Sequence, residues 1–405
     1  KSDETTELNH KLNTFETPSQ INISTFKMDF EKTLWHGVLG LGSKLSQVIS
    51  DNAYLVFDFP QNDPVQNKVR SNKFKYTERV YAGYINYGHS IFSKWKCNAG
   101  LRFEHTDALG NLEAFLPELQ EPPVKLNYQS LFPSAGLSWD IHPHHNLALN
   151  YGRRINRPDY NVLNPFNNQL SQLSFERGNP FLKPEIVNNL ELGYTLNSLY
   201  NFKIAYSLTK DQITRLIGPD TSDIRASYIN WDNLATQKIW SANVSCPIDI
   251  TKYWSAYFNL SGSFINNQAN YGNGAIVDIQ AYSYELFQQQ SFTLPYGIKA
   301  EISGSYSGPG VWGGVFIYEP SWNLNVGLQR KFIHNKLNAK LNGSDLFYES
   351  GWDGYSDFDG LYAKGFGRND TQKIALSLSY QLGNQNVKSR KRNTGLEEEA
   401  GRVKG

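Results

Sequence analysis

The stretch Trp322–Gln329 reads Trp-Asn-Leu-Asn-Val-Gly-Leu-Gln, in which apolar side chains alternate with polar residues or glycine. Successive side chains of a β-strand point to opposite faces, so this alternation predicts a strand with one apolar and one polar face. The same alternation recurs at 189–196, 254–264, 337–342 and 374–382. The longer runs reach about 9–11 residues, the length of a tilted strand that crosses a bilayer, whereas strands in soluble proteins usually have about 5–6.

Short turns alternate with long polar stretches along the chain. Tight turns are predicted at Leu34–Gly37, Ser93–Lys96, His142–Asn146, Asn197–Asn201, Asp249–Tyr253, Leu294–Gly297 and Ile333–Lys336. Long loops are predicted at roughly 59–73, 106–126, 155–184, 210–232, 266–276, 305–314 and 347–370. Short turns at one end and long loops at the other are typical of an outer-membrane barrel. In the stretch 78–87 both alternating sets contain apolar residues, so its two faces stay unassigned.

Composition excludes several other classes of protein. The longest purely apolar run is Ala53–Phe57, far shorter than the ~20 residues of a membrane-spanning helix. Lys and Arg number 39 against 38 Asp and Glu, so the net charge of +1 argues against a nucleic-acid-binding surface. An aromatic content of 14% argues against a disordered chain. The motifs GxSxG, HExxH and GxxxxGK[ST] are absent, so we predict no enzyme activity, no cofactor and no metal site.

A soluble β-propeller is the alternative all-β fold. Its blades have about 40–50 residues and four short strands each. Each interval between predicted turns holds two long strands and one long loop instead, and no Trp-Asp signature recurs at a fixed period. We therefore predict an all-β protein, an antiparallel transmembrane β-barrel whose lumen-facing side chains are polar.

Three neighbouring stretches contain motifs that resemble those of a known protein family. Arg153–Pro158 reads Arg-Arg-Ile-Asn-Arg-Pro, Gly178–Glu185 reads Gly-Asn-Pro-Phe-Leu-Lys-Pro-Glu, and Leu190–Tyr194 reads Leu-Glu-Leu-Gly-Tyr. Together they resemble the outer-membrane β-barrel family allied to TonB-dependent receptors, and the similarity runs from about residue 70 to residue 383. The resemblance marks Gly178, Asn179, Pro180, Leu182, Lys183, Pro184 and Glu185 as a family motif, to which we assign a structural role because Gly and Pro fix turns.

The resemblance implies a function and a location. Members of this family import scarce solutes across the outer membrane of Gram-negative bacteria, through a barrel of about 22 strands plugged by an N-terminal domain. An energy-transducing periplasmic protein drives the import. We therefore expect an outer-membrane receptor or transporter barrel for a nutrient that the sequence does not name. The alternative is a non-transporting barrel that acts as a scaffold or surface receptor, with a surface lipoprotein as a conceivable partner.

The number of strands bears on how much of such a barrel this chain contains. One strand precedes the first predicted turn, two fill each interval and two follow the last turn, which gives about 15 strands, whereas bacterial single-chain barrels have an even number. No plug domain or energy-coupling box is recognisable. We therefore expect residues 1–383 to be the C-terminal portion of a larger barrel. Any contact with the energy-transducing protein would then need a missing N-terminal region.

Residues 384–405 follow the last alternating stretch. They contain the basic cluster Lys388–Arg392 and the acidic run Glu397–Glu399. We expect them to form a polar, solvated periplasmic tail, because little in their composition favours packing.

Two groups of residues are candidates for ligand binding. Arg153, Arg154 and Arg157 lie at the start of the 155–185 loop, where they and two further basic residues, Arg177 and Lys183, outnumber Asp159, Glu176 and Glu185. These charges could instead pair with one another in the lumen. The second group lies in a predicted external loop and consists of Trp352, Asp353, Tyr355, Asp357 and Asp359. Aromatic rings stack on sugar rings and carboxylates accept hydrogen bonds from hydroxyls, so a glycan contact is one interpretation. An aromatic girdle at the membrane interface is the other.

Overall fold

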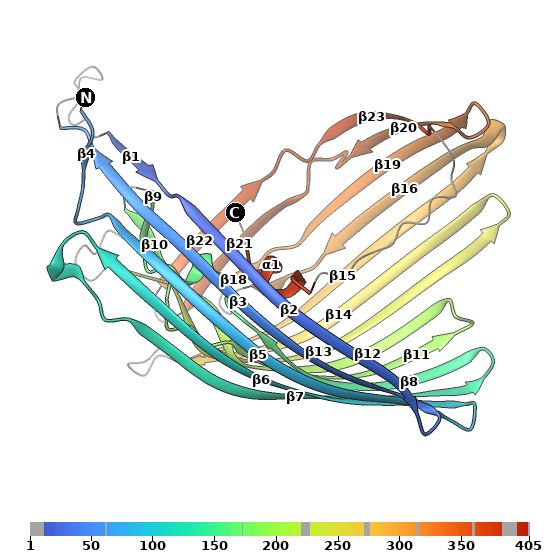
Figure 1. Ribbon diagram of the computed structural model, residues 1–405. Helices are drawn as coiled ribbons and strands as arrows, with labels where there is room; N and C mark the ends of the chain where they lie inside the picture. The colour runs from blue at the N-terminus through green and yellow to red at the C-terminus, as the bar shows by residue number, and fades with distance from the viewer. Residues whose placement is uncertain are drawn as a thin grey trace, which may run out of the picture.

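The computed structural model describes residues 12–60, 63–171, 173–219, 227–270, 276–312, 316–358, 361–382 and 395–403. Long strands dominate these residues and form a single curved sheet (Figure 1). They are β2 (Ser19–Leu34), β3 (Gly37–Asp58), β5 (Asn72–Ile91), β6 (Trp95–Ala114), β7 (Val124–His142), β8 (His145–Asn156), β11 (Glu185–Leu196), β12 (Tyr200–Pro219), β13 (Ser227–Thr251), β14 (Trp254–Asn270), β15 (Ile276–Leu294), β16 (Ile298–Ser307), β19 (Ser321–Phe332), β20 (Leu337–Ser344) and β23 (Lys373–Tyr380). These fifteen strands confirm the strand count predicted from the sequence.

Each long strand pairs antiparallel with the next long strand along the chain. Short segments join the sheet at its loop end: β1 (Asn13–Glu16), β4 (Val65–Gln66), β9 (Asn167–Ser171) and β10 (Ser174–Arg177). Strands β2 and β23 lie at the two edges, and no pairing between described residues joins them. The described sheet is therefore an open, trough-shaped part of a barrel wall (Figure 1).

All seven predicted tight turns connect consecutive strands, so they lie together at one end of the sheet. In the first, Trp35 and His36 adopt left-handed backbone conformations with φ of 48° and 61°. Turns with positive φ at both central residues match the twist of the flanking strands. Three predicted loops, 106–126, 210–232 and 266–276, are shorter than expected, because strand pairing continues to Ala114 in β6, to Pro219 in β12 and to Asn270 in β14. Polar residues can extend a hydrogen-bonded ladder beyond the apolar stretch that marks the membrane.

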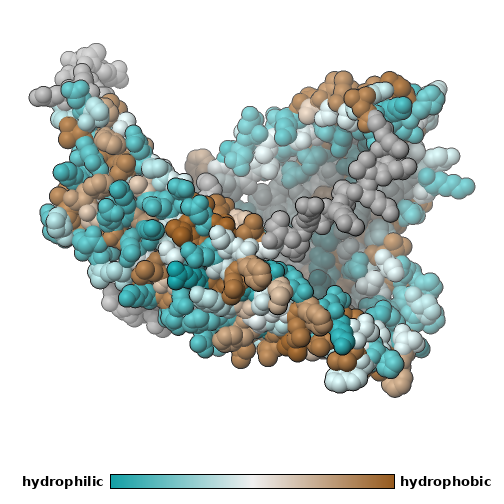
Figure 2. Space-filling model, viewed as in Figure 1, coloured by the Kyte–Doolittle hydropathy of each residue, from teal (hydrophilic) through white to brown (hydrophobic). Residues whose placement is uncertain are grey.

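The two faces of the sheet differ in polarity. From Lys44 to Val56 in β3 and from Phe74 to Ala82 in β5 the even-numbered residues point inward and are buried, whereas Leu45 and Ile85 are exposed on the outer face. This pattern assigns the faces of the 78–87 stretch that the sequence leaves open. In Figure 2 the outer surface carries broad apolar patches, and the visible part of the hollow is mostly hydrophilic. No helix among the described residues is long and apolar enough to span a membrane.

The hollow of the sheet is partly filled by the loop between β8 and β11, residues 157–184, called the lumenal loop below. It contains the single turn η2 (Asn161–Leu163) and the strands β9 and β10. Leu163 and Leu182 from this loop pack against the inward side chains of Val56 and Phe74 in one buried cluster. Apolar contacts therefore fix the loop inside the trough.

A second, smaller sheet is built from two other long connections. It contains β17 (Gly310–Trp312), β18 (Phe316–Tyr318), β21 (Gly351–Phe358) and β22 (Leu361–Arg368). The remaining elements are the single turns η1 (Pro117–Leu119) and η3 (Pro295–Gly297) and the short helix α1 (Glu397–Gly401). Figure 1 shows α1, in red, within the hollow of the large sheet.

An arginine on the outer face of β19 should impair membrane assembly. Val326 is 38% exposed and pairs with the outward Ile302 of β16. Val326→Arg should cost about 2–4 kcal/mol if the position lies near the bilayer midplane. The matched control is Ser303→Arg, since Ser303 lies next to Ile302 but on the inward face, opposite Asn325. The folded fraction is measured as heat-dependent gel mobility in isolated outer membranes, and equal loss in both variants would contradict the assigned faces.

Candidate functional site

The family motif, Gly178–Glu185, holds the end of the lumenal loop in place through close backbone contacts and hydrogen bonds. Gly178 approaches the backbone of η2 so closely that a β-carbon would lie 2.2 Å from the Asn164 carbonyl oxygen. The backbone N–H of Asn179 donates to the Val162 carbonyl at 2.8 Å, and its side-chain amide donates to the Trp231 carbonyl at 2.9 Å. Pro180, Leu182 and Pro184 are buried. These contacts join the loop to itself and to β13.

The second half of the motif reaches the base of the β12–β13 hairpin. The backbone N–H of Lys183 donates to the side-chain oxygen of Asn233 at 2.7 Å, and the Asn233 amide donates back to the Lys183 carbonyl at 2.9 Å. Glu185 accepts from the backbone N–H of Ile213 at 2.8 Å and from the side chain of Asn156 at 2.6 Å. The motif residues thus contact β8, β12 and β13 around the end of the loop.

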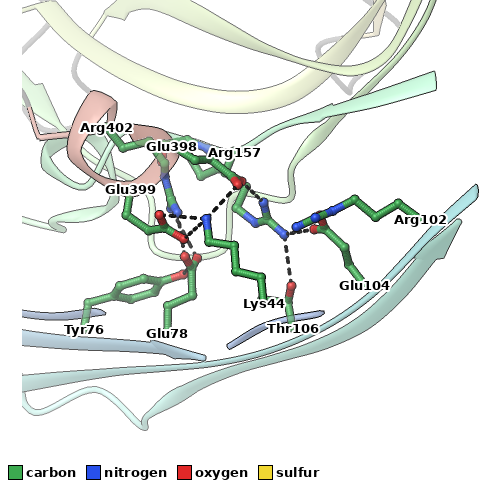
Figure 3. Close-up of polar contacts among 11 residues, drawn as sticks. Lys44, Tyr76, Glu78, Arg102, Glu104, Thr106, Arg157, Glu398, Glu399 and Arg402 are labelled. Atoms are coloured by element: carbon green, nitrogen blue, oxygen red, sulfur yellow. Dashed lines mark hydrogen bonds and ion pairs between the residues drawn. The ribbon is translucent and has the colours of Figure 1, made fainter. Parts of the chain in front are cut away.

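Arg157, at the start of the lumenal loop, lies at the centre of a buried charge network (Figure 3). Its guanidinium is 2.5 Å from Glu104 on β6 and 3.3 Å from the hydroxyl of Thr106. Arg102 also binds Glu104. The Arg157 side chain is only 2% exposed, so these partners replace the water that a buried charge needs.

The other side of the network comes from the C-terminal residues Gly395–Val403, called the tail segment below. Glu399 lies 2.8 Å and Glu398 3.3 Å from the ammonium group of Lys44 on β3. Glu398 also lies 2.5 Å from Arg157. Arg402 binds Glu78 on β5 through two nitrogens, at 2.5 and 3.2 Å. Figure 3 shows these side chains pointing toward one another from the wall, the loop and α1.

For the described residues Gly395–Val403, this arrangement corrects the expectation of a solvated tail. Glu399 and Arg402 are 4% and 7% exposed. Few apolar residues favour packing of this segment, but ion pairs hold it inside the polar lumen. Residues 384–394, which include the basic cluster Lys388–Arg392, and residues 404–405 lie outside the described residues.

The charges of the network keep its acidic and basic side chains ionised. Burial alone raises the pKa of the Glu398 carboxyl, but the positive charges of Arg157 and Lys44 outweigh it and hold that pKa below its ordinary value. Burial alone lowers the pKa of Arg402, but Glu78 outweighs it and raises that pKa above its ordinary value. Both side chains are therefore ionised at neutral pH.

A cavity of about 780 Å³ lies beside the network, between the loop ends of β2 and β3, the lumenal loop and β13. Its walls include the aromatic rings of Tyr54, Phe166 and Trp231 and the amides of Asn52 and Asn164. Such a volume and such a mixture of apolar surface with a few polar groups suit a small-molecule site.

The three predicted arginines do not form one site. Arg157 belongs to the buried network. Arg154 is exposed on the inward face of β8, whereas Arg153 lies on the outward face with Leu149 and Tyr151. Adjacent strand residues point to opposite faces, so the sequence Arg153–Arg154 necessarily separates the two guanidinium groups.

The second predicted group lies on the β21–β22 hairpin of the small sheet. Asp353, Tyr355 and Asp357 share one face because they alternate along β21, while Trp352 lies on the other face, with its ring 6.0 Å from that of Phe316. Asp353 is 3.6 Å from Arg368, and Tyr355 stacks on Tyr362. Asp359 lies outside the described residues.

Glu78, Glu104, Glu398 and Arg402 were missed by the sequence analysis. They come from three separate segments, β5, β6 and the tail segment, so no local spacing marks them as one group. In the described part of the chain, no three His, Cys, Asp or Glu side chains are grouped so as to hold a metal ion.

The family model described as "Outer membrane protein beta-barrel family" matches residues 1–380. The chain belongs to this family. The resemblance drawn from the sequence is thereby confirmed, and this barrel protein is assigned to the outer membrane of a Gram-negative bacterium. Among curated proteins there is no significant match.

Solved structures of similar fold include three outer-membrane receptors and transporters. The ferric yersiniabactin uptake receptor FyuA from Yersinia pestis has a TM-score of 0.64 at 12% identity, with 91% of this chain and 55% of that chain covered. The siderophore receptor PiuA from Acinetobacter baumannii has a TM-score of 0.59 at 14% identity, covering 92% and 57%. The copper transporter OprC has a TM-score of 0.65 at 12% identity, covering 90% and 57%. At these identities the likeness concerns the fold, and this barrel chain spans little more than half the length of each.

Removing the positive charge of Arg157 should strongly destabilise the protein. Arg157→Gln leaves Glu104 buried with Arg102 as its remaining cation, so the free energy of unfolding should fall by about 3–5 kcal/mol. The control is Arg177→Gln in the same loop, since the exposed Arg177–Glu121 pair should contribute about 0–1 kcal/mol. Urea unfolding in lipid vesicles measures both, and similar losses would contradict the importance of the network.

A methyl group at Gly178 should displace the lumenal loop. Gly178→Ala forces its β-carbon against the Asn164 and Val162 carbonyls and should cost about 1–3 kcal/mol. Gly262→Ala on β14 is the control, because its β-carbon would meet no atom within 4 Å. Limited proteolysis of the loop reports the displacement. Equal protease resistance in both variants would show that the loop does not depend on this close approach.

Proposed function

We propose that the protein is an outer-membrane receptor and transporter barrel that takes up a small nutrient, which binds first in the cavity beside the lumenal loop. Family membership and the shared fold support the barrel role. The observation that carries the proposal is the position of the cavity, inside the curve of the wall at the end where the long loops lie. A solute arriving from outside the cell would meet this end first.

The lining of the cavity suggests the chemistry of the solute. Aromatic rings offer flat apolar surface, and side-chain amides offer both donors and acceptors. Tyr160 also lines the cavity, is 2% exposed, and its hydroxyl has no hydrogen-bond partner among the described residues. A solute oxygen could supply that partner. These features fit a polar solute with apolar faces, such as a sugar or an organic metal chelate.

The exposed hairpin is a second candidate for contact with ligand. We keep Asp353, Tyr355 and Asp357 as predicted ligand contacts, together with Arg154 on the inward face. Ligand contact by Trp352, Asp359 and the outward Arg153 stays a prediction from the sequence. Transport would further require an energy-transducing periplasmic protein, which the siderophore and copper relatives suggest only by analogy.

The alternative function is a scaffold or surface receptor that does not transport. One observation favours it. Tyr362 and Phe366 are 64% and 75% exposed on one face of the β21–β22 hairpin and form an apolar surface suited to a protein partner such as a surface lipoprotein.

Uptake measurements test the proposal. Cells with and without the gene receive labelled oligosaccharides, ferric chelates and copper, and we expect at least one to enter in a gene-dependent manner. Trp231→Leu should then reduce uptake at limiting solute by about 10-fold, which corresponds to about 1.4 kcal/mol of lost binding. Trp240→Leu is the control, because Trp240 lies on the exposed outer face of β13.

Two results would contradict the proposal. One is that no solute enters in a gene-dependent manner while a partner protein co-purifies with the barrel, which would favour the scaffold. The other is that Trp240→Leu reduces uptake as much as Trp231→Leu at equal protein level, which would separate transport from the cavity.

A further inference from the structure

We propose that the tail segment, Gly395–Val403, is an internal ligand of the lumen: it docks on a site built for it and latches the start of the lumenal loop against the barrel wall. This inference goes beyond the proposed function, because docking of the tail segment needs no solute and no transport.

The charges of the wall and of the tail segment are complementary. Lys44 and Glu78 are inward residues of neighbouring strands, with side chains 8% and 3% exposed. Both ion-pair partners of Lys44 in the described chain, Glu398 and Glu399, come from the tail segment. The ion-pair partner of Glu78 there is Arg402 of the same segment. Buried charges are retained only where opposite charges compensate them, so these two wall positions match the tail segment.

Arg402 joins three parts of the molecule. Its guanidinium binds Glu78 on the wall, donates to the Pro158 carbonyl at 3.0 Å, and lies 4.1 Å from the centre of the Tyr160 ring. The backbone N–H of Tyr160 in turn donates to the Arg402 carbonyl at 3.4 Å. A planar guanidinium can make all these contacts at once, whereas an ammonium group cannot. Arg402 is therefore the residue through which the latch acts on the loop.

The tail segment owes its order to docking. Helix α1 has 5 residues, and helices of this length do not form alone in water. Its ion pairs to Lys44, Glu78 and Arg157 use charges that water or another charged segment can also satisfy. These properties fit a detachable latch better than they fit a permanent part of the core.

The latch also shapes the cavity. Arg402 and Val403 line it on the side where Tyr160, Asn161 and Val162 of the lumenal loop do. Release of the tail segment would therefore remove one part of the cavity wall and free the loop turn that forms another. The tail segment and the cavity are then two coupled parts of the lumen.

Spin labelling of the full-length protein in outer-membrane vesicles tests the latch. Cys97 and Cys246 are first replaced by Ser, and a nitroxide is attached at Ala400→Cys, whose side chain is exposed. We expect an immobilised spectrum that loses its immobilised component in Arg402→Gln. Glu78→Gln should produce the same loss from the wall side, because it removes the same ion pair from a different element.

A second label and a control complete the experiment. A nitroxide at Asn161→Cys, on the exposed side of η2, should also become mobile in Arg402→Gln if the tail segment holds the loop. Lys203→Gln breaks another ion pair on the inward face, to Glu191 at 3.1 Å, and should leave both spectra unchanged. Should Arg402→Gln fail to assemble, Glu398→Gln is the milder variant, because the side chain of Glu398 is 45% exposed.

The proposal is overturned if the label at position 400 is already mobile in the unsubstituted background. It is also overturned if Arg402→Gln and Glu78→Gln leave that label immobilised. A mobile tail with an unchanged label at position 161 would overturn the action on the loop. None of these outcomes depends on whether the barrel transports a nutrient.

Discussion

The structure depends on the absence of water in the hydrocarbon layer of the membrane. Every backbone N–H and C=O there must pair within the protein, so a chain without spanning helices crosses as long, laterally paired strands. The continuous pairing from β2 to β23 meets this requirement across the described sheet. Because the ladder satisfies the backbone, side chains are free to differ by face: apolar toward lipid and polar toward the lumen.

The polar lumen creates a second requirement. A charge that is enclosed there by the loop and the tail segment loses water and needs an opposite charge. Lys44, Glu78 and Glu104 on the wall meet this need with Arg157 of the lumenal loop and with Glu398, Glu399 and Arg402 of the tail segment. The network thereby orders two segments that contribute little to the sheet, and through Arg402 it borders the cavity that we propose as the solute site.

The sequence predicts the sheet well because strand faces and turns are local properties. Alternation along 322–329 and the turn at 34–37 each depend on a few adjacent residues, and both agree with the structure. The network depends on residues as far apart as Glu78 and Arg402, and their meeting is a consequence of the tertiary fold. The same limit explains why the tail segment was expected in solvent, and why Arg153 and Arg157 were grouped although the fold separates them.

The central claim is that wall, lumenal loop and tail segment form one charged unit inside the barrel. An electron cryo-microscopy map of the full-length protein in lipid nanodiscs tests it most directly. The account predicts continuous density for Gly395–Val403 in the lumen, with Arg402 against Glu78 and Tyr160. Density for these residues outside the lumen, with Lys44 and Glu78 turned to other partners, would contradict it.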